Sequence, residues 1–271
     1  YSAVIYYMLC SYLLWARYKG VPPQDLVPPA LAHSADYYGT FVSTSTKAGR
    51  LPLSDGGTTA LAPDWIAMLA HVTGDPRWTK MLAESLTTDL EEIINRPTSG
   101  SWLTYDVRTL IYGLADFSRQ EEIVPVFRIH QGTGHATSRR DTPYGPVRLH
   151  LCGSSATEGH SHADKSAILL EAFGEMLLTD RGTPVYSDPA VQLVKLARLH
   201  NLVTPVNAHG DEMDQRNPCP AAIVPQGEGN EHTLHLTIDA SPAWFSPVLH
   251  IQRCVDSDDP LHFAITDEVE M

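Results

Sequence analysis

Cysteine is scarce in this sequence. The four cysteines, Cys10, Cys152, Cys219 and Cys254, are scattered and form no CxxC pair, which excludes a disulfide scaffold but leaves the redox compartment open. Long polar or low-complexity tracts are absent, and 43% of the residues are hydrophobic. A largely disordered chain is therefore excluded, and the 271 residues suffice to bury a sizeable core.

Basic residues are also few, with 19 Lys and Arg against 32 Asp and Glu, and the formal net charge is −13. The sequence has no stripe rich in Lys or Arg, so we expect no nucleic-acid partner bound through a basic face. A polyanionic substrate is compatible with this charge, because a local pocket can be positive on an acidic protein.

Residues 1–18 form an apolar run close to the roughly 20 residues that a membrane-spanning helix needs. Five tyrosines and two serines in this run favour a helix buried in a bundle, so we expect no membrane span. The sequence starts at Tyr1 and not at Met, and Met271 lies within a strand-like run, which indicates a piece of a longer protein. Any signal peptide would lie upstream; a periplasmic or secreted location is favoured over the cytoplasm.

The pattern of elements changes near residue 120. Before it, an Asp75-Pro76 pair gives an N-cap and a first-turn proline. Helices are predicted over 1–18, 30–41, 63–73, 75–95 and 102–118. After it come short, β-branched and often alternating runs that are typical of strands, with a tight turn at Gly174-Glu175. The sequence predicts a helical part over 1–120 and an antiparallel β-sandwich over 121–271.

Residues 159–164, with the sequence GHSHAD, are the strongest candidates for chemistry. If this segment is extended, alternate side chains share a face, and His160, His162 and Asp164 point the same way. Downstream, Asp180 ends an apolar strand and His200 precedes the strand-like run NLVTPV. Imidazole nitrogens and a carboxylate suit Zn²⁺, and three such ligands leave one position open. The competing interpretation is a surface loop with two solvated histidines.

Two hydrolase patterns fit this segment poorly. The H-x-H-x-D-H pattern of metallo-β-lactamases requires a histidine after Asp164, where this sequence has Lys165. The H-x-H pair of amidohydrolase barrels belongs to a repeating β/α alternation, which is absent here. Most other histidines, including His135 and His150, are interpreted as surface or strand positions.

A longer stretch resembles a known family. The run GHSHADKSAILLEAFGEMLLTDRGTPVYSDP, followed by RLHNLVTPVN, is similar to the signature of heparinase II/III-like polysaccharide lyases, which include oligoalginate lyases. The upstream segments FRIHQGTGHATSRRD, PVRLHLCGS and LPLSDGGT are also similar to this family. The resemblance implies the end of an (α/α) toroid before residue 120, then the start of the family's β-sandwich, incomplete at its C-terminus.

The resemblance also implies a metal site and a catalytic set. The family's zinc ligands fall on His162, Asp180 and His200, and the zinc is structural. A histidine that faces the substrate falls on His160, and a tyrosine of the site falls on Tyr186.

A further tyrosine, which transfers protons from a toroid helix, falls on Tyr1, with Tyr6 and Tyr7 as close competitors. Tyr6 is also a candidate substrate-binding residue. The Asn-His pair that the family uses to neutralise the substrate carboxylate has no match before His160, so it is expected upstream.

The implied reaction is β-elimination at a glycosidic bond to a uronic acid. Such a site neutralises the carboxylate, removes the C5 proton and protonates the leaving oxygen. Arg139 and Arg181 are candidate positive groups. The expected partner is a uronic-acid polysaccharide or oligosaccharide, first alginate and then a glycosaminoglycan, with a homodimer as an option. The alternatives are a non-catalytic zinc-containing carbohydrate-binding homologue and a zinc-dependent hydrolase.

Overall fold

The computed structural model describes residues 15–16, 18–22, 25, 29–45, 49–58, 63–86, 118–155 and 160–271. Tyr1 and Tyr6, and almost all of the predicted helices 1–18 and 102–118, lie outside these residues. The chain divides into two compact units, residues 1–39 with 61–123 and residues 40–60 with 124–271. Residues 40–60 therefore belong with the strands, although they precede residue 120. No helix among the described residues is long and apolar enough to cross a membrane.

The first unit contains the described helices. These are α2 (Pro29–Ala32), α3 (Ser34–Gly39), α4 (Pro63–Thr73) and α5 (Pro76–Leu86). Asp75 caps α5, because its Oδ1 accepts a hydrogen bond from the Arg77 backbone N–H at 3.0 Å. The Arg77 guanidinium also forms salt bridges with Asp36 and Asp75, both at 2.6 Å. The predicted helix 63–73 matches α4, whereas the (α/α) toroid stays a prediction.

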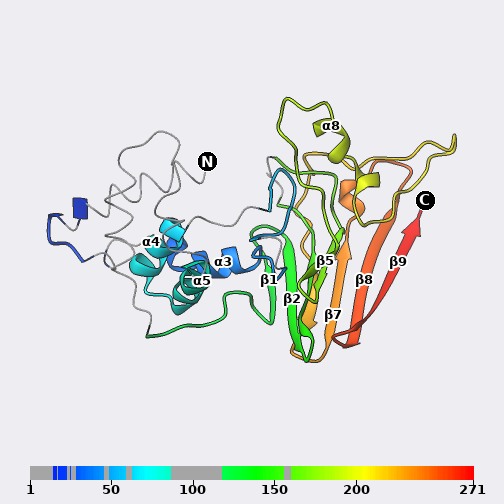
Figure 1. The fold of residues 1–271 in the computed structure, drawn as a ribbon. Helices are drawn as coiled ribbons and strands as arrows, with labels where there is room; N and C mark the ends of the chain where they lie inside the picture. Colours follow the sequence, from blue (N-terminus) through cyan, green and yellow to red (C-terminus); the bar gives the residue numbers. More distant parts are fainter. Residues whose placement is uncertain are drawn as a thin grey trace. The chain divides into compact units, whose positions relative to one another are not determined.

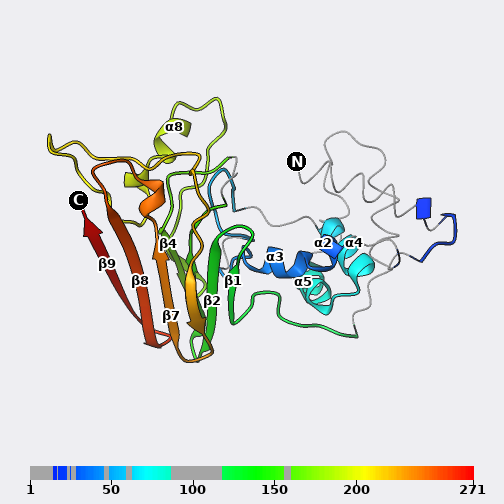
Figure 2. The ribbon, with the colours of Figure 1, turned by 180° about the vertical axis from the view of Figure 1, so that it is seen from behind.

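The second unit consists of two antiparallel sheets (Figures 1 and 2). The five-stranded sheet runs in the order β1 to β5, and the four-stranded sheet in the order β6 to β9. Their strands are β1 (Phe127–His130), β2 (His135–Thr142), β3 (Gly145–Leu151), β4 (Ile168–Ala172), β5 (Glu175–Leu178), β6 (Gln226–Gly229), β7 (Leu234–Asp239), β8 (His250–Asp259) and β9 (His262–Glu270). Short helical turns occur at α8 (Val191–Val194), η2 (Ala197–Leu199) and η3 (Ser241–Ala243).

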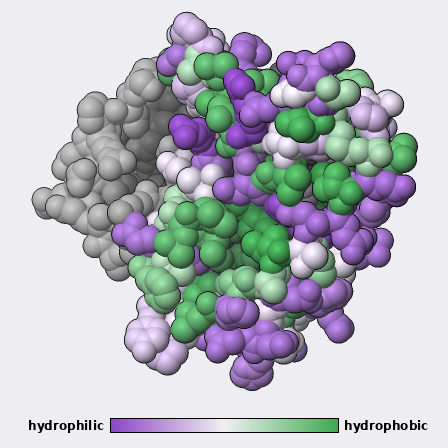
Figure 3. Space-filling model, turned by 90° about the vertical axis from the view of Figure 1, so that its right-hand side faces the viewer, coloured by the Kyte–Doolittle hydropathy of each residue, from purple (hydrophilic) through white to green (hydrophobic). Residues whose placement is uncertain are grey.

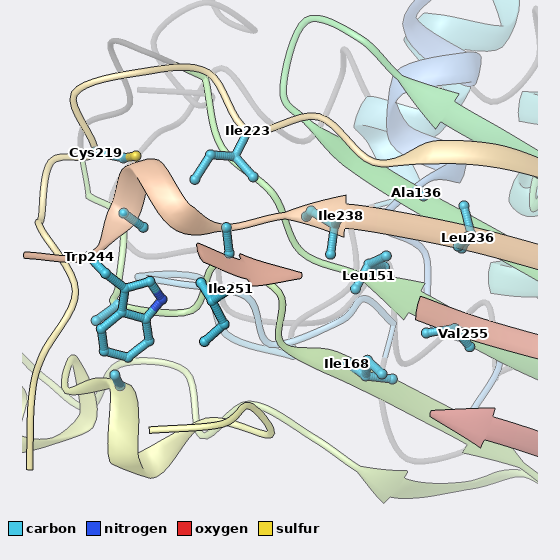
Figure 4. Packing of buried hydrophobic residues seen from close by; sticks show 14 of the residues in the cluster. Ala136, Leu151, Ile168, Cys219, Ile223, Leu236, Ile238, Trp244, Ile251 and Val255 are labelled. Carbon is cyan, nitrogen blue, oxygen red and sulfur yellow. The ribbon is translucent and has the colours of Figure 1, made fainter. Parts of the chain in front are cut away.

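A hydrophobic core joins the inner faces of the two sheets (Figure 4). Alternation along each strand places its apolar residues on this side, as in the buried–exposed pattern of β7. The largest contributors include Leu149, Leu151, Ile168, Leu236, Ile238, Trp244, Ile251 and Val255. Because one core contains residues of both sheets, the predicted antiparallel β-sandwich is confirmed for this unit.

The apolar row continues onto the last strand. Ile265 and Val269 of β9 pair with Val255 and Ile251 of β8, so they lie on the core-facing side of the sheet. They remain 45% and 42% exposed. Figure 3 views the molecule from the right-hand side of Figure 1 and shows apolar side chains gathered in a patch on that face.

Two local predictions differ from the structure. The β4–β5 turn has positive φ at Phe173 and Gly174, so the two-residue turn lies one position earlier than Gly174-Glu175. Residues 201–206 form a loop and not a strand, and the Asn201 side chain there donates hydrogen bonds to the backbone carbonyls of Ile168 and Thr179.

Residues 40–45 and 49–58 cover the outer face of β3 and β4. The buried Glu171 carboxylate accepts hydrogen bonds from the Ser43 hydroxyl and from the backbone and hydroxyl of Thr44, at 2.8 and 2.9 Å for the latter. Arg148, also buried, lies 3.8 Å from Glu171 and donates to the Thr40 carbonyl. This buried ion pair fixes the covering segment to the sheet.

We predict that Glu171→Ala lowers the free energy of unfolding by about 3–5 kcal/mol, because Arg148 would keep a buried charge without a counter-ion. Urea denaturation measures this loss. Glu228→Ala removes an exposed glutamate from β6 and is the matched control. Equal stability of the two variants would show that the pair does not hold the segment.

Candidate active site

The segment that carries His160 and His162 is a loop and not a strand. His160 has φ of +61° and Ser166 has φ of +75°, both in the left-handed region. The expectation that His160, His162 and Asp164 share one face is therefore wrong. The His162 side chain is buried, whereas the His160 side chain is 59% exposed.

Asp164 has a structural environment. Its carboxylate forms a buried ion pair with the Lys165 ammonium at 2.6 Å and accepts a hydrogen bond from Ser54 at 3.1 Å. Burial acts to raise the pKa of Asp164, but the Lys165 charge outweighs it and holds the pKa below its ordinary value. A buried, ion-paired carboxylate has no access to a substrate, which argues against Asp164 as the general base of a hydrolase.

Three predicted ligands come together in the interior of this unit. One donor atom each of His162, Asp180 and His200 lies within 4.8 Å of the others, and all three side chains are buried. His200 Nδ1 lies 3.4 Å from Asp180 Oδ2, without the alignment of a hydrogen bond. Both ring nitrogens of His200 and the Nδ1 atom of His162 are buried without a hydrogen-bond partner among the residues that the structure describes.

Unsatisfied buried nitrogens are costly, so this cluster fits a bound cation better than an empty interior. The other nitrogen of His162, Nε2, lies 3.2 Å from Asp55 Oδ1 and 3.0 Å from Thr183 Oγ1. A carboxylate only accepts hydrogen bonds, so Nε2 carries the proton and Nδ1 keeps its lone pair toward Asp180 and His200. A carboxylate behind a histidine is the usual support of a metal-binding imidazole. Two imidazoles and a carboxylate are donors that suit Zn²⁺.

Asp55 lies at the centre of the site, a position that its place in the sequence did not predict. Its Oδ2 lies 2.7 Å from His160 Nδ1 and 2.8 Å from the Tyr186 hydroxyl. Its Oδ1 accepts a hydrogen bond from Thr183 at 2.8 Å and lies 3.2 Å from Lys195 Nζ. Burial opposes ionisation, but hydrogen bonds from these four groups hold the pKa of Asp55 well below its ordinary value.

Glycine permits the close approach of the loops that meet at Asp55. Gly182 has φ of +62°, and a Cβ atom at this position would lie 2.6 Å from the Gly56 carbonyl oxygen. Only glycine fits such a backbone contact. The Asp55 turn and the loop that carries Thr183 and Tyr186 are therefore held against each other. The only sequence signal for Asp55 was the LPLSDGGT segment, which resembled the family without indicating a role.

Tyr186 is 65% exposed beside His160, with its hydroxyl 3.1 Å from His160 Nδ1. Its hydrogen bond to the Asp55 carboxylate raises the pKa of Tyr186 above the ordinary value, so the side chain is a phenol near neutral pH. His160 donates Nδ1–H to Asp55, so Nε2 is the ring nitrogen that can offer a lone pair. An exposed imidazole and an exposed phenol therefore share the Asp55 carboxylate.

The remaining predicted residues are two arginines and the tyrosines of the first predicted helix. Arg181 is exposed and directly follows Asp180 in the loop that leads to Tyr186. Arg139, on β2, forms a salt bridge with Asp141 at 2.8 Å. Tyr1, Tyr6 and Tyr7 lie outside the described residues.

Comparison with known proteins gives a fold but no sequence family. No family model matches the sequence, and no curated protein matches it. Among solved structures, a mutant of the heparan sulfate lyase HepC from Pedobacter heparinus matches 85% of this chain, with a TM-score of 0.54 and 16% identity. A structure of heparinase III matches 88%, with a TM-score of 0.53 and 12% identity. The non-mutant HepC structure gives a TM-score of 0.50 at 18% identity over 84% of the chain.

These likenesses establish a heparinase-like polysaccharide lyase fold. The chain spans 30% to 34% of the length of these structures. The likeness to oligoalginate lyases, which the sequence analysis also expected, has no counterpart among these matches.

We predict that Asp55→Asn lowers the free energy of unfolding by about 1–3 kcal/mol, because an amide cannot accept all the hydrogen bonds that converge on the carboxylate. Urea denaturation is the measurement. Asp258→Asn, at an exposed aspartate of β8, is the control. A loss no larger than that of the control would contradict the central position of Asp55.

Proposed function

We propose that this chain is part of a lyase that cleaves a uronic-acid-containing polysaccharide by β-elimination. The observation that carries the proposal is the pair of exposed side chains, His160 and Tyr186, that share the Asp55 carboxylate next to a buried group of metal-binding donors. The fold supports it, because the matching structures are those of a heparan sulfate lyase and of heparinase III. We therefore place a glycosaminoglycan first among substrates and alginate second.

Zinc is part of this proposal. His162, Asp180 and His200 would hold the ion, with Asp55 and Thr183 behind His162. When bound, the zinc would supply a positive charge beside the buried Asp180 carboxylate. It would also tie together the loops that carry His162, Asp180 and His200. The proton transfers proposed below belong to the protein side chains alone.

His160 is the proposed base and Tyr186 the proposed acid. The Nε2 lone pair of His160 takes the C5 proton of the uronate, and the electrons of the broken C–H bond form the C4=C5 double bond. The bond from C4 to the glycosidic oxygen breaks, and the Tyr186 phenol protonates that oxygen. The imidazolium then loses its Nε2 proton to solvent, and the phenolate regains a proton from solvent, which restores the Nε2 lone pair and the phenol for the next turnover.

The C5 proton is poorly acidic while the neighbouring substrate carboxylate keeps its charge, so positive groups must face it. Arg181 is exposed in the loop between Asp180 and Tyr186 and is proposed for this task. Lys195 lies 3.2 Å from Asp55 and adds positive charge to the same site.

The zinc proposal predicts that His162→Ala loses one equivalent of bound zinc and lowers the melting temperature at the same time, since metal binding is part of the folding free energy. Elemental analysis and thermal denaturation measure the two effects. His209→Ala, at an exposed histidine, should change neither. Unchanged zinc content in His162→Ala would refute the ligand assignment.

The reaction predicts a rise in ultraviolet absorbance from the conjugated C4=C5 double bond when the protein is incubated with heparan sulfate, chondroitin, hyaluronan or alginate in turn. His160→Ala and Tyr186→Phe should each lower this rate by about 10²–10⁴-fold, because they remove the base or the acid. Zinc content should stay unchanged in both. Tyr144→Phe, at an exposed tyrosine of the β2–β3 turn, is the matched control.

Other outcomes point to the alternative functions. New reducing ends without a new double bond, lost on chelation, would indicate a zinc-dependent hydrolase. Binding of a uronate polymer without any cleavage would indicate a carbohydrate-binding homologue. Either result contradicts the lyase.

A further inference from the structure

A second group of metal-binding side chains lies under the covering segment, on the outer face of the five-stranded sheet. In the β2–β3 register, Ala136 pairs with Leu151, so His135 lies opposite Cys152 by continuation of the ladder. His150 precedes Cys152 by two residues and therefore points to the same face. Two imidazoles and a thiol thus meet across neighbouring strands.

The three side chains are close and almost fully buried. His150 Nε2 lies 3.1 Å from His135 Nδ1, and one donor atom of each residue lies within 4.8 Å of the others. The Phe41 ring packs on both imidazoles, with centroid distances of 5.3 and 5.8 Å. Leu51 of the covering segment packs against Cys152. The group is therefore shielded from water and separate from the candidate active site.

The two imidazoles face each other beneath the covering segment, where burial disfavours a charged ring. Two nitrogens that face each other at 3.1 Å share one proton in the absence of another group. The opposite nitrogen, His150 Nδ1, is buried near the Thr40 backbone, and no described residue gives it a hydrogen bond of good geometry.

We propose that His135, His150 and Cys152 bind a Zn²⁺ ion, in addition to the ion proposed at His162, Asp180 and His200. The ion takes the place of the proton between the rings, and the His150 proton moves to Nδ1, toward the Thr40 backbone. The Cys152 thiol releases its proton to solvent and binds as thiolate, so one proton leaves for each ion bound.

The distances suit this ion. Zinc bonds of about 2.0–2.1 Å to nitrogen and about 2.3 Å to sulfur separate tetrahedral donors by about 3.3–3.6 Å. The two imidazole nitrogens already lie near this separation, and the thiol, within 4.8 Å of them, needs to move by about 1.2 Å at most to reach about 3.6 Å. A thiolate with two imidazoles favours zinc over magnesium or calcium, which prefer oxygen ligands.

A third group, His235, Cys254 and Asp256, is less suited. It lies on the surface, and His235 and Asp256 are each 53% exposed. Burial and the hydrogen bond to Asp256 raise the pKa of the Cys254 thiol to about 11, which disfavours the thiolate that a metal needs. This group must still be removed in any test that detects sulfur ligation.

Cobalt distinguishes the sites, because Co²⁺ replaces Zn²⁺ and gives a thiolate-to-metal charge-transfer band in the near ultraviolet only with a cysteine ligand. The group around His162 has no cysteine. The test uses the chain with Cys10→Ser, Cys219→Ser and Cys254→Ser, in which Cys152 is the one remaining thiol. After metal removal by a chelator, the chain is titrated with Co²⁺ and followed by absorbance and elemental analysis.

We expect two bound cobalt ions and the charge-transfer band. Adding Cys152→Ser should abolish the band and leave one ion, whereas adding His162→Ala should keep the band and also leave one ion. His135→Gln is a second variant that should remove the band. Absence of the band in the single-thiol chain with its circular dichroism spectrum intact, or a band that survives Cys152→Ser, would overturn the proposal. Neither result depends on lyase activity.

Discussion

The buried carboxylate of Asp55 is the group on which the site depends. Five side chains from three other segments converge on it: His160, His162, Thr183, Tyr186 and Lys195. An isolated carboxylate would be too costly to bury as an ion, but these hydrogen bonds and the Lys195 charge keep it ionised. Because the carboxylate only accepts hydrogen bonds, it also fixes which nitrogen of each histidine carries the proton.

Asp55 occupies this position because the segment that carries it is held on the sheet. Glu171 and Arg148 on the outer face bind the backbone and hydroxyl groups of residues 40–44, and Leu51 packs against Leu169. The outer face of the sheet is thus also buried, and polar contacts hold its cover in place. Both proposed metal-binding groups depend on this cover. The group around His162 depends on Asp55, which contacts His162 Nε2. The group around His135 depends on Phe41 and Leu51, which help to bury it.

Strands were predictable where one face packs on the core, because strict alternation then follows from burial. The run HTLHLTID became β7 and VLHIQRC became part of β8. Prediction was wrong where backbone hydrogen bonds are made by side chains and not by a neighbouring strand. Residues 160–164 form a loop shaped by contacts with Asp55 and Asn217, and NLVTPV is a loop held by Asn201. Such contacts leave no periodic pattern.

The sequence by itself determined the antiparallel sandwich, since hydrophobic alternation is local and the core follows from it. It also made His160, His162, Asp180, Tyr186 and His200 candidates, because their residue types and spacing resemble a family signature. Only the tertiary structure placed Asp55 against His160, from which it is 105 positions distant in the chain. The same holds for His135, His150 and Cys152, which had been interpreted as separate strand or scattered positions. Strand register and the fold of a covering loop decide these contacts, and neither is encoded in the local pattern of either partner.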